Sequence, residues 1–218
     1  MGTRLWLVRH GQTDWNFEGR IQGHTPTELN ATGRRQAMEL AVAFARKRFA
    51  AVYASDLPRA MQTAAPIAAE LGLGIISTPL LRERDLGPYE GLLEPQAVAL
   101  RRSSGAGAGR GDLADWTGVP GVETDAAVWE RADRIFREII AAHEECDVLV
   151  VTHGGILART IYKTLGIPDS QERRFSLANG MVAVVEYRDG WPFLLSLADV
   201  GLMGEGRPTA DTATARGG

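Results

Sequence analysis

The run Leu5-Trp6-Leu7-Val8-Arg9-His10-Gly11 is the most informative indication of the fold of this chain. Its four apolar residues are typical of a buried strand, and the glycine marks a break after it. Open α/β sheets bind ligands at the carboxyl ends of their strands, so the stretch predicts a strand that delivers an imidazole and a guanidinium to such an end. A histidine after one strand is more often packed or solvated than catalytic, and this motif alone favours that structural role.

A second segment repeats the same order of residue types. The run Val148-Leu149-Val150-Val151 is the most apolar predicted strand, and Thr152-His153-Gly154-Gly155 follows it. The glycines open a predicted helix over residues 155–165. Helix N-termini attract anions through free backbone N–H groups, and glycine lets an oxyanion approach the backbone. The two segments together predict paired imidazoles, although each histidine still has a structural alternative in a hydrogen bond to a neighbour.

The pattern along the chain alternates strands and helices. Strands are predicted at residues 3–9, 49–54, 74–77 and 147–152, and a hairpin at residues 181–187 and 193–197. Helices are predicted at residues 33–48 (capped by Asn30 or Thr32), 55–71 (capped by Ser55 or Asp56), 95–102, 125–145 and 155–165. This order predicts a three-layer α/β/α fold with a mostly parallel central sheet flanked by helices.

Residues 1–203 are predicted to form a single domain. We expect residues 92–124 to be a substrate-side insertion, residues 103–111 within it a mobile Gly/Ala-rich excursion, and residues 204–218 a disordered tail.

The composition of the chain excludes some classes of function. The 24 basic and 27 acidic residues are interspersed, with a net charge of −3, which argues against a general nucleic-acid or membrane-surface binder. The single cysteine excludes an intrachain disulfide and fits a reducing compartment, so we expect a cytoplasmic protein.

Two further segments carry candidate functional groups. Arg59 lies in the first turn of a predicted helix, where the helix dipole disfavours a cation. A bidentate phosphate contact would explain this position, and a salt bridge to Asp56 or to another acid is the structural alternative. The loop of residues 80–93 offers Glu83, Asp85 and Glu90 as general acids, of which we expect at least two to be ordinary loop carboxylates.

These segments resemble the signature of the histidine phosphatase superfamily, in its phosphoglycerate mutase-like branch. The matching blocks cover residues 3 to about 187 in the order of the family: Leu7-Val8-Arg9-His10-Gly11-Gln12-Thr13-Asp14-Trp15-Asn16, Gly19-Arg20-Ile21-Gln22-Gly23-His24-Thr25, Leu29-Asn30-Ala31-Thr32-Gly33, Ser55-Asp56-Leu57-Pro58-Arg59-Ala60, Leu81 to Gly91, Thr152-His153-Gly154-Gly155 and Asn179-Gly180. An Arg-His-Gly match alone is weakly specific, whereas the ordered set is highly specific.

The resemblance implies a mechanism and a set of site residues. His10 would attack a phosphoryl group to give a phosphohistidine that water hydrolyses, with Glu83 as general acid and base. The other residues implied in catalysis would surround the phosphoryl oxygens: Arg9, Arg59 and His153. The residues implied in substrate binding are Asn16, Gln22, Gly23 and Gly154. No metal site and no cofactor are expected, so protein cations would stabilise the transferring group.

The acid loop and the segment Gln22-Gly23-His24-Thr25 resemble the phosphatase form of the family. We therefore expect a metal-independent phosphomonoesterase for a small soluble metabolite. Two alternatives stay open: a phosphoglycerate mutase that requires 2,3-bisphosphoglycerate, and a non-catalytic module that binds a phosphorylated ligand. Two segments differ from the usual sequence of the family: Gly121-Val122-Glu123-Thr124 and Pro26-Thr27-Glu28. These differences weaken any close analogy between this chain and one particular relative. A homodimer is left open, and the expected partner is the phosphomonoester substrate, with no nucleic acid or membrane.

Overall fold

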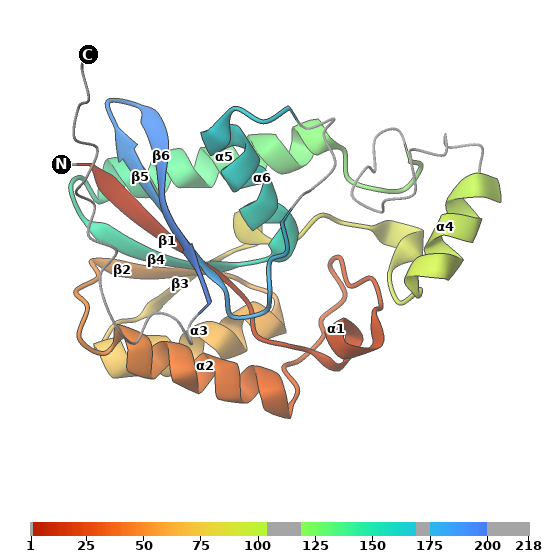
Figure 1. The fold of residues 1–218 in the computed structure, drawn as a ribbon, viewed down its shortest axis with the longest axis horizontal. Coiled ribbons are helices and arrows are strands. Elements are labelled where there is room, and N and C mark those ends of the chain that lie inside the picture. The colour runs from red at the N-terminus through yellow and green to blue at the C-terminus, as the bar shows by residue number, and fades with distance from the viewer. Residues whose placement is uncertain (1, 104–118, 169–174, 200–218) are drawn as a thin grey trace, which may run out of the picture.

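The computed structural model describes residues 2–103, 119–168 and 175–199 (Figure 1). Its strands are β1 (Thr3–Arg9), β2 (Ala51–Ser55), β3 (Ile75–Thr78), β4 (Asp147–Thr152), β5 (Val182–Arg188) and β6 (Trp191–Ala198). Its α-helices are α1 (Asp14–Glu18), α2 (Ala31–Phe44), α3 (Pro58–Leu71), α4 (Glu94–Ser103), α5 (Asp125–Ala142) and α6 (Gly154–Leu165), and the 3₁₀ helices are η1 (Pro79–Leu81) and η2 (Gly87–Tyr89). The predicted tail at 204–218 and most of the Gly/Ala-rich stretch lie outside the described residues.

The strands form one sheet in the order β3-β2-β4-β1-β5-β6. The first four run parallel, β5 is antiparallel to β1, and β6 is antiparallel to β5. Asp189 and Gly190 connect β5 to β6 with φ values of 51° and 80°. Two positive φ angles are what a two-residue type I′ hairpin requires. The predicted mostly parallel sheet and the predicted hairpin are confirmed.

Helices cover both faces of the sheet. In Figure 1, α2 and α3 lie below it and α5 and α6 above it. Leu5 and Leu7 of β1 pack into the α5–α6 layer, and Trp6 and Val8 pack into the α2–α3 layer. Successive strand side chains point to opposite faces, so a strand covered on both faces has the continuous apolar run seen in the sequence. The three-layer prediction is confirmed, and α1 and α4 lie beyond the end of the sheet at which β1 ends.

Local differences from the prediction occur at helix ends. Asn30 caps α2 by accepting from Gly33 N at 2.9 Å, but α2 ends at Phe44 rather than at residue 48. The predicted caps of α3 are wrong, because the N-cap is Leu57 and has no side-chain hydrogen bond. Helix α1 was not predicted at all within the long loop; Thr13 caps it, and its five residues are too few to show a helical period.

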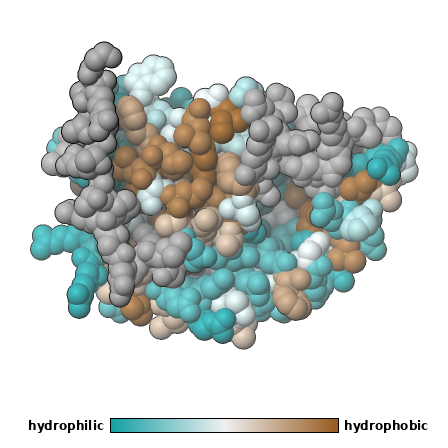
Figure 2. All heavy atoms as spheres, in the orientation of Figure 1, coloured by the Kyte–Doolittle hydropathy of each residue, from teal (hydrophilic) through white to brown (hydrophobic). Residues whose placement is uncertain are grey.

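Figure 2 shows hydrophobic side chains gathered where the β5–β6 hairpin faces the viewer. Strand β6 exposes Trp191, Phe193 and Leu195, which alternate along the strand and therefore share one side of it. This edge strand carries no charged residue, although charges are a common protection for such edges. Among the described residues, no helix combines the length and the hydropathy needed to cross a bilayer.

The core predicts a contrast between two positions on α2. Leu40 is fully buried between α2 and the sheet, whereas Met38 is 58% exposed on the same helix. We expect Leu40→Ala to lower the free energy of unfolding by about 2–5 kcal/mol because it leaves a cavity. Met38→Ala should change it by no more than about 0.5 kcal/mol. Urea unfolding of both variants measures the difference, and equal losses would contradict the assigned packing.

Candidate active site

The register between β1 and β4 brings the two predicted histidines together. Arg9 lies opposite Thr152 in this parallel pair, so His10 and His153 leave the sheet at the same point. Their ring centroids are 5.1 Å apart, with an angle of 60° between the ring planes. Both side chains are buried. The expectation of paired imidazoles at the carboxyl ends of the strands is therefore met by the geometry.

His10 is held in one orientation by main-chain contacts. Its Nδ1 lies 2.7 Å from the carbonyl oxygen of Gly11. A carbonyl oxygen only accepts, so Nδ1 carries the proton and Nε2 of the neutral ring has the free lone pair. Burial, followed by the positive charges of Arg59 and Arg9, places the pKa of His10 well below 6.5. At neutral pH the ring is therefore uncharged and able to act as a nucleophile through Nε2.

His153 is buried beside it with one ring nitrogen unused. Nε2 lies 2.8 Å from Ser55 Oγ, while Nδ1 has no hydrogen-bond partner among the residues that the structure describes. Burial, then the charges of Arg59 and His10, lower the pKa of His153 well below 6.5. A buried nitrogen of this kind is costly unless a bound group satisfies it. His153 thus offers a contact to a ligand.

Arg59 is fully buried in the first turn of α3. Its guanidinium donates to the carbonyl oxygens of Gly23 at 2.7 Å and Thr25 at 2.9 Å, and to Thr27 Oγ1 at 3.3 Å. Burial lowers its pKa to about 10, while the charges of Glu83 and Glu90 act in the opposite direction. Arg59 therefore remains a cation at neutral pH.

The alternative of a salt bridge from Arg59 to Asp56 is wrong. Asp56 accepts two hydrogen bonds from Arg82, at 2.7 and 2.6 Å. The side chain of Arg59 instead supports the chain from Gly23 to Thr27. Its charge lies close enough to both imidazoles to lower their pKa values. Arg59 at this helix start thus supports the loop of residues 23–27, and a contact of its guanidinium with phosphate stays a prediction.

Two adjacent glycines at the start of α6 allow Arg9 and Glu83 to approach the backbone. A Cβ atom on Gly154 would lie 3.2 Å from Arg9 Nε, and one on Gly155 would lie 2.2 Å from Glu83 Oε1. Arg9 also donates through Nη1 to the carbonyl oxygen of Leu177. Glycine is needed at 155 because any larger residue would displace the carboxylate.

Glu83 is the acid of its loop that reaches the N-terminus of α6. Its Oε2 accepts from Gly155 N and its Oε1 from Arg84 N, both at 2.9 Å. Asp85 instead accepts from Gly87 N within its own loop. Glu90 accepts from the main-chain N–H groups of His24 and Thr25. The three candidate acids therefore bind different parts of the chain, and Glu83 is the one that binds the glycine segment after His153.

The predicted substrate-binding residues are linked to these groups by hydrogen bonds. Gly23 has a φ of 51° and offers its carbonyl oxygen to Arg59. Gln22 Oε1 accepts from the hydroxyls of Thr13 at 3.1 Å and Thr27 at 2.6 Å. Asn16 Oδ1 accepts from Asn179 Nδ2, which also donates to the carbonyl oxygen of His10 at 3.0 Å. All of these residues border the group formed by Arg59 and His10.

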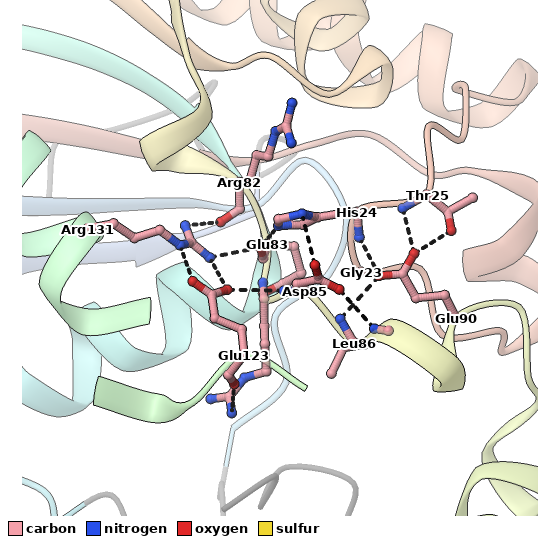
Figure 3. A network of polar contacts seen from close by, with 12 residues as sticks. Gly23, His24, Thr25, Arg82, Glu83, Asp85, Leu86, Glu90, Glu123 and Arg131 are labelled. Atoms are coloured by element: carbon pink, nitrogen blue, oxygen red, sulfur yellow. Dashed lines mark hydrogen bonds and ion pairs between the residues drawn. The ribbon is translucent and has the colours of Figure 1, made fainter. Parts of the chain in front are cut away.

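Arg131 was not singled out from the sequence, and the contacts made by Glu90 and His24 were not predicted either (Figure 3). Glu90 joins two loops, because its carboxylate accepts from His24 N at 2.7 Å and from Thr25 N at 2.8 Å. His24 Nε2 lies 2.8 Å from the carbonyl oxygen of Glu83. Arg131 of α5 reaches the same carbonyl at 2.8 Å. A helix residue such as Arg131 gives no motif signal, since three of its partners are main-chain carbonyls and the fourth is the carboxylate of Glu123.

Other places that could hold a ligand are separate from this group. A hollow of about 580 Å³ lies between α1 and the start of α2, and its lining includes Trp15, Thr27 and Arg34. None of the predicted catalytic residues lines it, although Thr27 also contacts Arg59. Within residues 2–103, 119–168 and 175–199, no three His, Cys, Asp or Glu side chains are grouped to hold a metal ion.

Fold and site together define a three-layer α/β/α protein with paired histidines, a buried Arg59 and a half-buried Arg9 at the carboxyl ends of its parallel strands. Residues 5–200 match the histidine phosphatase superfamily (branch 1), and the chain belongs to that superfamily. The predicted resemblance is confirmed.

Three known proteins show the range of the relatives. The metal-independent phosphoserine phosphatase of Arabidopsis thaliana is 36% identical, over 94% of this chain and 87% of its own. The probable phosphoglycerate mutase GpmB of Proteus mirabilis (strain HI4320) is 33% identical, over 85% of this chain and 86% of its own. The crystal structure of the alpha-ribazole phosphatase from Shigella flexneri has a TM-score of 0.77 and 28% identity, over 90% of this chain and 96% of its own.

The electrostatics of the site predict a change in the titration of His10. We expect its imidazole to titrate below 6.5, and Arg9→Met to raise the pKa because one of the two nearby positive charges is removed. Burial remains in the variant, so the pKa should stay below 6.5. NMR titration of the histidine ring signals measures both values. Arg20→Met, which removes a cation paired with Glu18, is the control and should leave His10 unchanged.

Proposed function

We propose that this chain is a metal-independent phosphomonoester hydrolase that acts on a small phosphorylated metabolite through a phosphohistidine on His10. The observation that carries the proposal is the neutral His10 ring, with its lone pair on Nε2, beside two guanidiniums. Relatives named as phosphatases and covering most of the chain support this activity.

In the first step, His10 Nε2 attacks phosphorus while the bond from phosphorus to the ester oxygen breaks. Glu83, protonated at this stage, gives its proton to the departing oxygen, so the product leaves as an alcohol. Arg9 and Arg59 stabilise the charge on the phosphoryl oxygens, and His153 contributes a hydrogen bond through Nδ1. The result is a phosphoryl group bonded to Nε2.

In the second step, the carboxylate of Glu83 takes a proton from water as the water oxygen attacks phosphorus. The bond between phosphorus and His10 Nε2 breaks, and inorganic phosphate leaves. Glu83 is protonated again, and His10 returns to its neutral form with the proton still on Nδ1. Covalent catalysis of this kind divides one difficult displacement into two easier ones.

The lowered pKa of His10 fits the nucleophilic role. The same two cations that would bind the phosphoryl group keep the imidazole unprotonated, since a protonated ring has no lone pair for attack. Arg59 remains charged because its pKa of about 10 is well above neutrality. The electrostatics therefore support a neutral nucleophile within a cationic site.

The mutase alternative rests on relatives such as the probable phosphoglycerate mutase GpmB. A mutase that requires 2,3-bisphosphoglycerate transfers the phosphoryl group from histidine back to a second hydroxyl instead of to water. The phosphatase form of the acid loop favours hydrolysis, and the intact set of His10, Glu83 and His153 disfavours a non-catalytic module. A cytoplasmic location stays a prediction.

The nucleophile is tested by one substitution. His10→Ala should abolish phosphate release, with a loss of at least about 10⁴-fold, because no other group can carry the phosphoryl intermediate. The measurement is phosphate release over a set of small phosphomonoesters, with EDTA present. Brief incubation of wild type with ³²P-labelled substrate should trap an acid-labile phosphohistidine that is absent from the variant. Loss of wild-type activity in EDTA would contradict the metal-independent mechanism.

The competing mutase activity is tested separately. With 2,3-bisphosphoglycerate present, we expect wild type not to interconvert 2- and 3-phosphoglycerate at a rate comparable to its release of phosphate from its best substrate. Coupled assays that follow both products measure the two rates. Faster interconversion than hydrolysis would identify the chain as a mutase and overturn the proposed reaction, although the role of His10 would stand.

A further inference from the structure

We infer that Arg131 of α5 is a positioning residue for Glu83, and that Glu123 holds Arg131 in the orientation this requires. The inference rests on the proposed function only in taking Glu83 as the general acid and base. The hydrogen bonds of Arg131 go to Glu123 and to the main chain of the loop that carries Glu83, and it acts on Glu83 through them. Its positive charge is also one of those that lower the pKa of His153.

The guanidinium of Arg131 uses all five of its N–H donors (Figure 3). Nη1 donates to the carbonyl oxygens of Leu80 at 3.0 Å and Arg82 at 2.6 Å. Nη2 donates to the carbonyl oxygen of Glu83 at 2.8 Å and to Glu123 Oε2 at 2.9 Å. Nε donates to Glu123 Oε1 at 2.7 Å. One side chain therefore fixes three carbonyls of the four consecutive residues that end at Glu83.

Glu123 completes the arrangement from the segment before α5. Its carboxylate receives Arg131 through both oxygens, which fixes the plane of the guanidinium. Oε2 also accepts from Asp85 N at 3.1 Å, and Glu123 N donates to the carbonyl oxygen of Asp85 at 2.9 Å. Glu123 thus binds the loop directly at Asp85, which follows Glu83 in the chain.

The Glu123–Arg131 pair is charged and largely shielded from solvent. The side chains of Glu123 and Arg131 are 18% and 14% exposed. Burial opposes ionisation of Glu123, but the hydrogen bonds and charge of Arg131 outweigh it and lower the pKa of the carboxyl group. A shielded, bidentate pair is more rigid than a pair at the surface, so it suits a positioning role.

The position of the Glu83 carboxylate depends on this support. The two hydrogen bonds on the carboxylate come from Gly155 N and Arg84 N, and Arg84 follows Glu83 in the same loop. His24 provides one further contact to the Glu83 carbonyl. Without Arg131 three carbonyls each lose a donor at once, and the Glu83 carbonyl keeps its contact with His24. A misplacement of about 1 Å in a catalytic group costs on the order of 100-fold in rate.

The dependence of kcat/KM on the leaving group distinguishes misplacement of a general acid from a loss of folded enzyme. A nitrophenolate departs readily without a proton, whereas an unsubstituted phenolate gains more from a general acid. The ratio of kcat/KM for p-nitrophenyl phosphate to that for phenyl phosphate therefore rises when acid catalysis is lost. A smaller fraction of folded enzyme lowers both values equally and leaves the ratio unchanged.

The experiment measures this ratio for wild type, Glu83→Gln, Arg131→Gln, Glu123→Gln and the double variant of Glu83 and Arg131. We expect Arg131→Gln to lower kcat/KM for phenyl phosphate by about 100-fold and to raise the ratio by about tenfold, as Glu83→Gln does. The double variant should keep the ratio of Glu83→Gln, because the positioned group is already absent. Glu123→Gln should raise the ratio by a smaller factor, since it keeps a side chain of the same shape.

The matched control lies on the same helix. Arg134 is 67% exposed and pairs with Glu138 one turn away, so Arg134→Gln removes a cation from α5 without touching the loop. Its ratio should equal that of wild type. Arg131→Lys should not restore the wild-type ratio, because a lysine has three donors on one nitrogen and cannot reach the carbonyls and Glu123 in one plane.

The outcomes distinguish this inference from the proposed function. If Glu83→Gln raises the ratio and Arg131→Gln does not, the positioning role is wrong while the assigned acid stands. If Glu83→Gln leaves the ratio unchanged, Glu83 is not the general acid and the proposed mechanism fails first. Should Arg131→Gln not fold, Glu123→Gln carries the same comparison, and an unchanged ratio in that variant overturns the inference.

Discussion

The parallel pairing of β1 with β4 is the constraint on which the site depends. Because Arg9 lies opposite Thr152, the residues after the two strands emerge at one height, and the imidazoles meet without any dedicated loop. The apolar runs that bury both strands also fix the register, since a slip by one residue would turn Leu5 and Leu7 to the wrong layer. The strand register that packs the core therefore also aligns the two histidines.

Two guanidiniums organise the loops around this point in the same way. Arg59 donates to carbonyls of the segment from Gly23 to Thr25, and Arg131 donates to carbonyls of the segment that ends at Glu83. Glu90 then ties the first segment to the acid loop. The loops that border the histidines are thus held by hydrogen bonds to their main chain, in addition to the packing of Leu86 and Tyr89 in a small apolar cluster.

The sequence predicted the layers, the sheet and the pairing of His10 with His153, because each of these leaves a signal in residue type. His10, His153 and Arg59 stand directly after strands or at a helix start. The choice of Glu83 over Asp85 could not be made by residue chemistry, since it depends on the path of the loop past Gly155. Arg131 escaped notice because carbonyl oxygens are present at every position. Helix α1 escaped because its capping box lies in an otherwise irregular stretch.

The contacts of Arg131 with Leu80, Arg82 and Glu83 are made to carbonyl oxygens alone. The side chains at the first two of these positions take no part in that support: Leu80 packs against the core and Arg82 holds Asp56. A carbonyl oxygen is present whatever residue stands there, so the support of Glu83 by Arg131 does not depend on the residue type at these two positions.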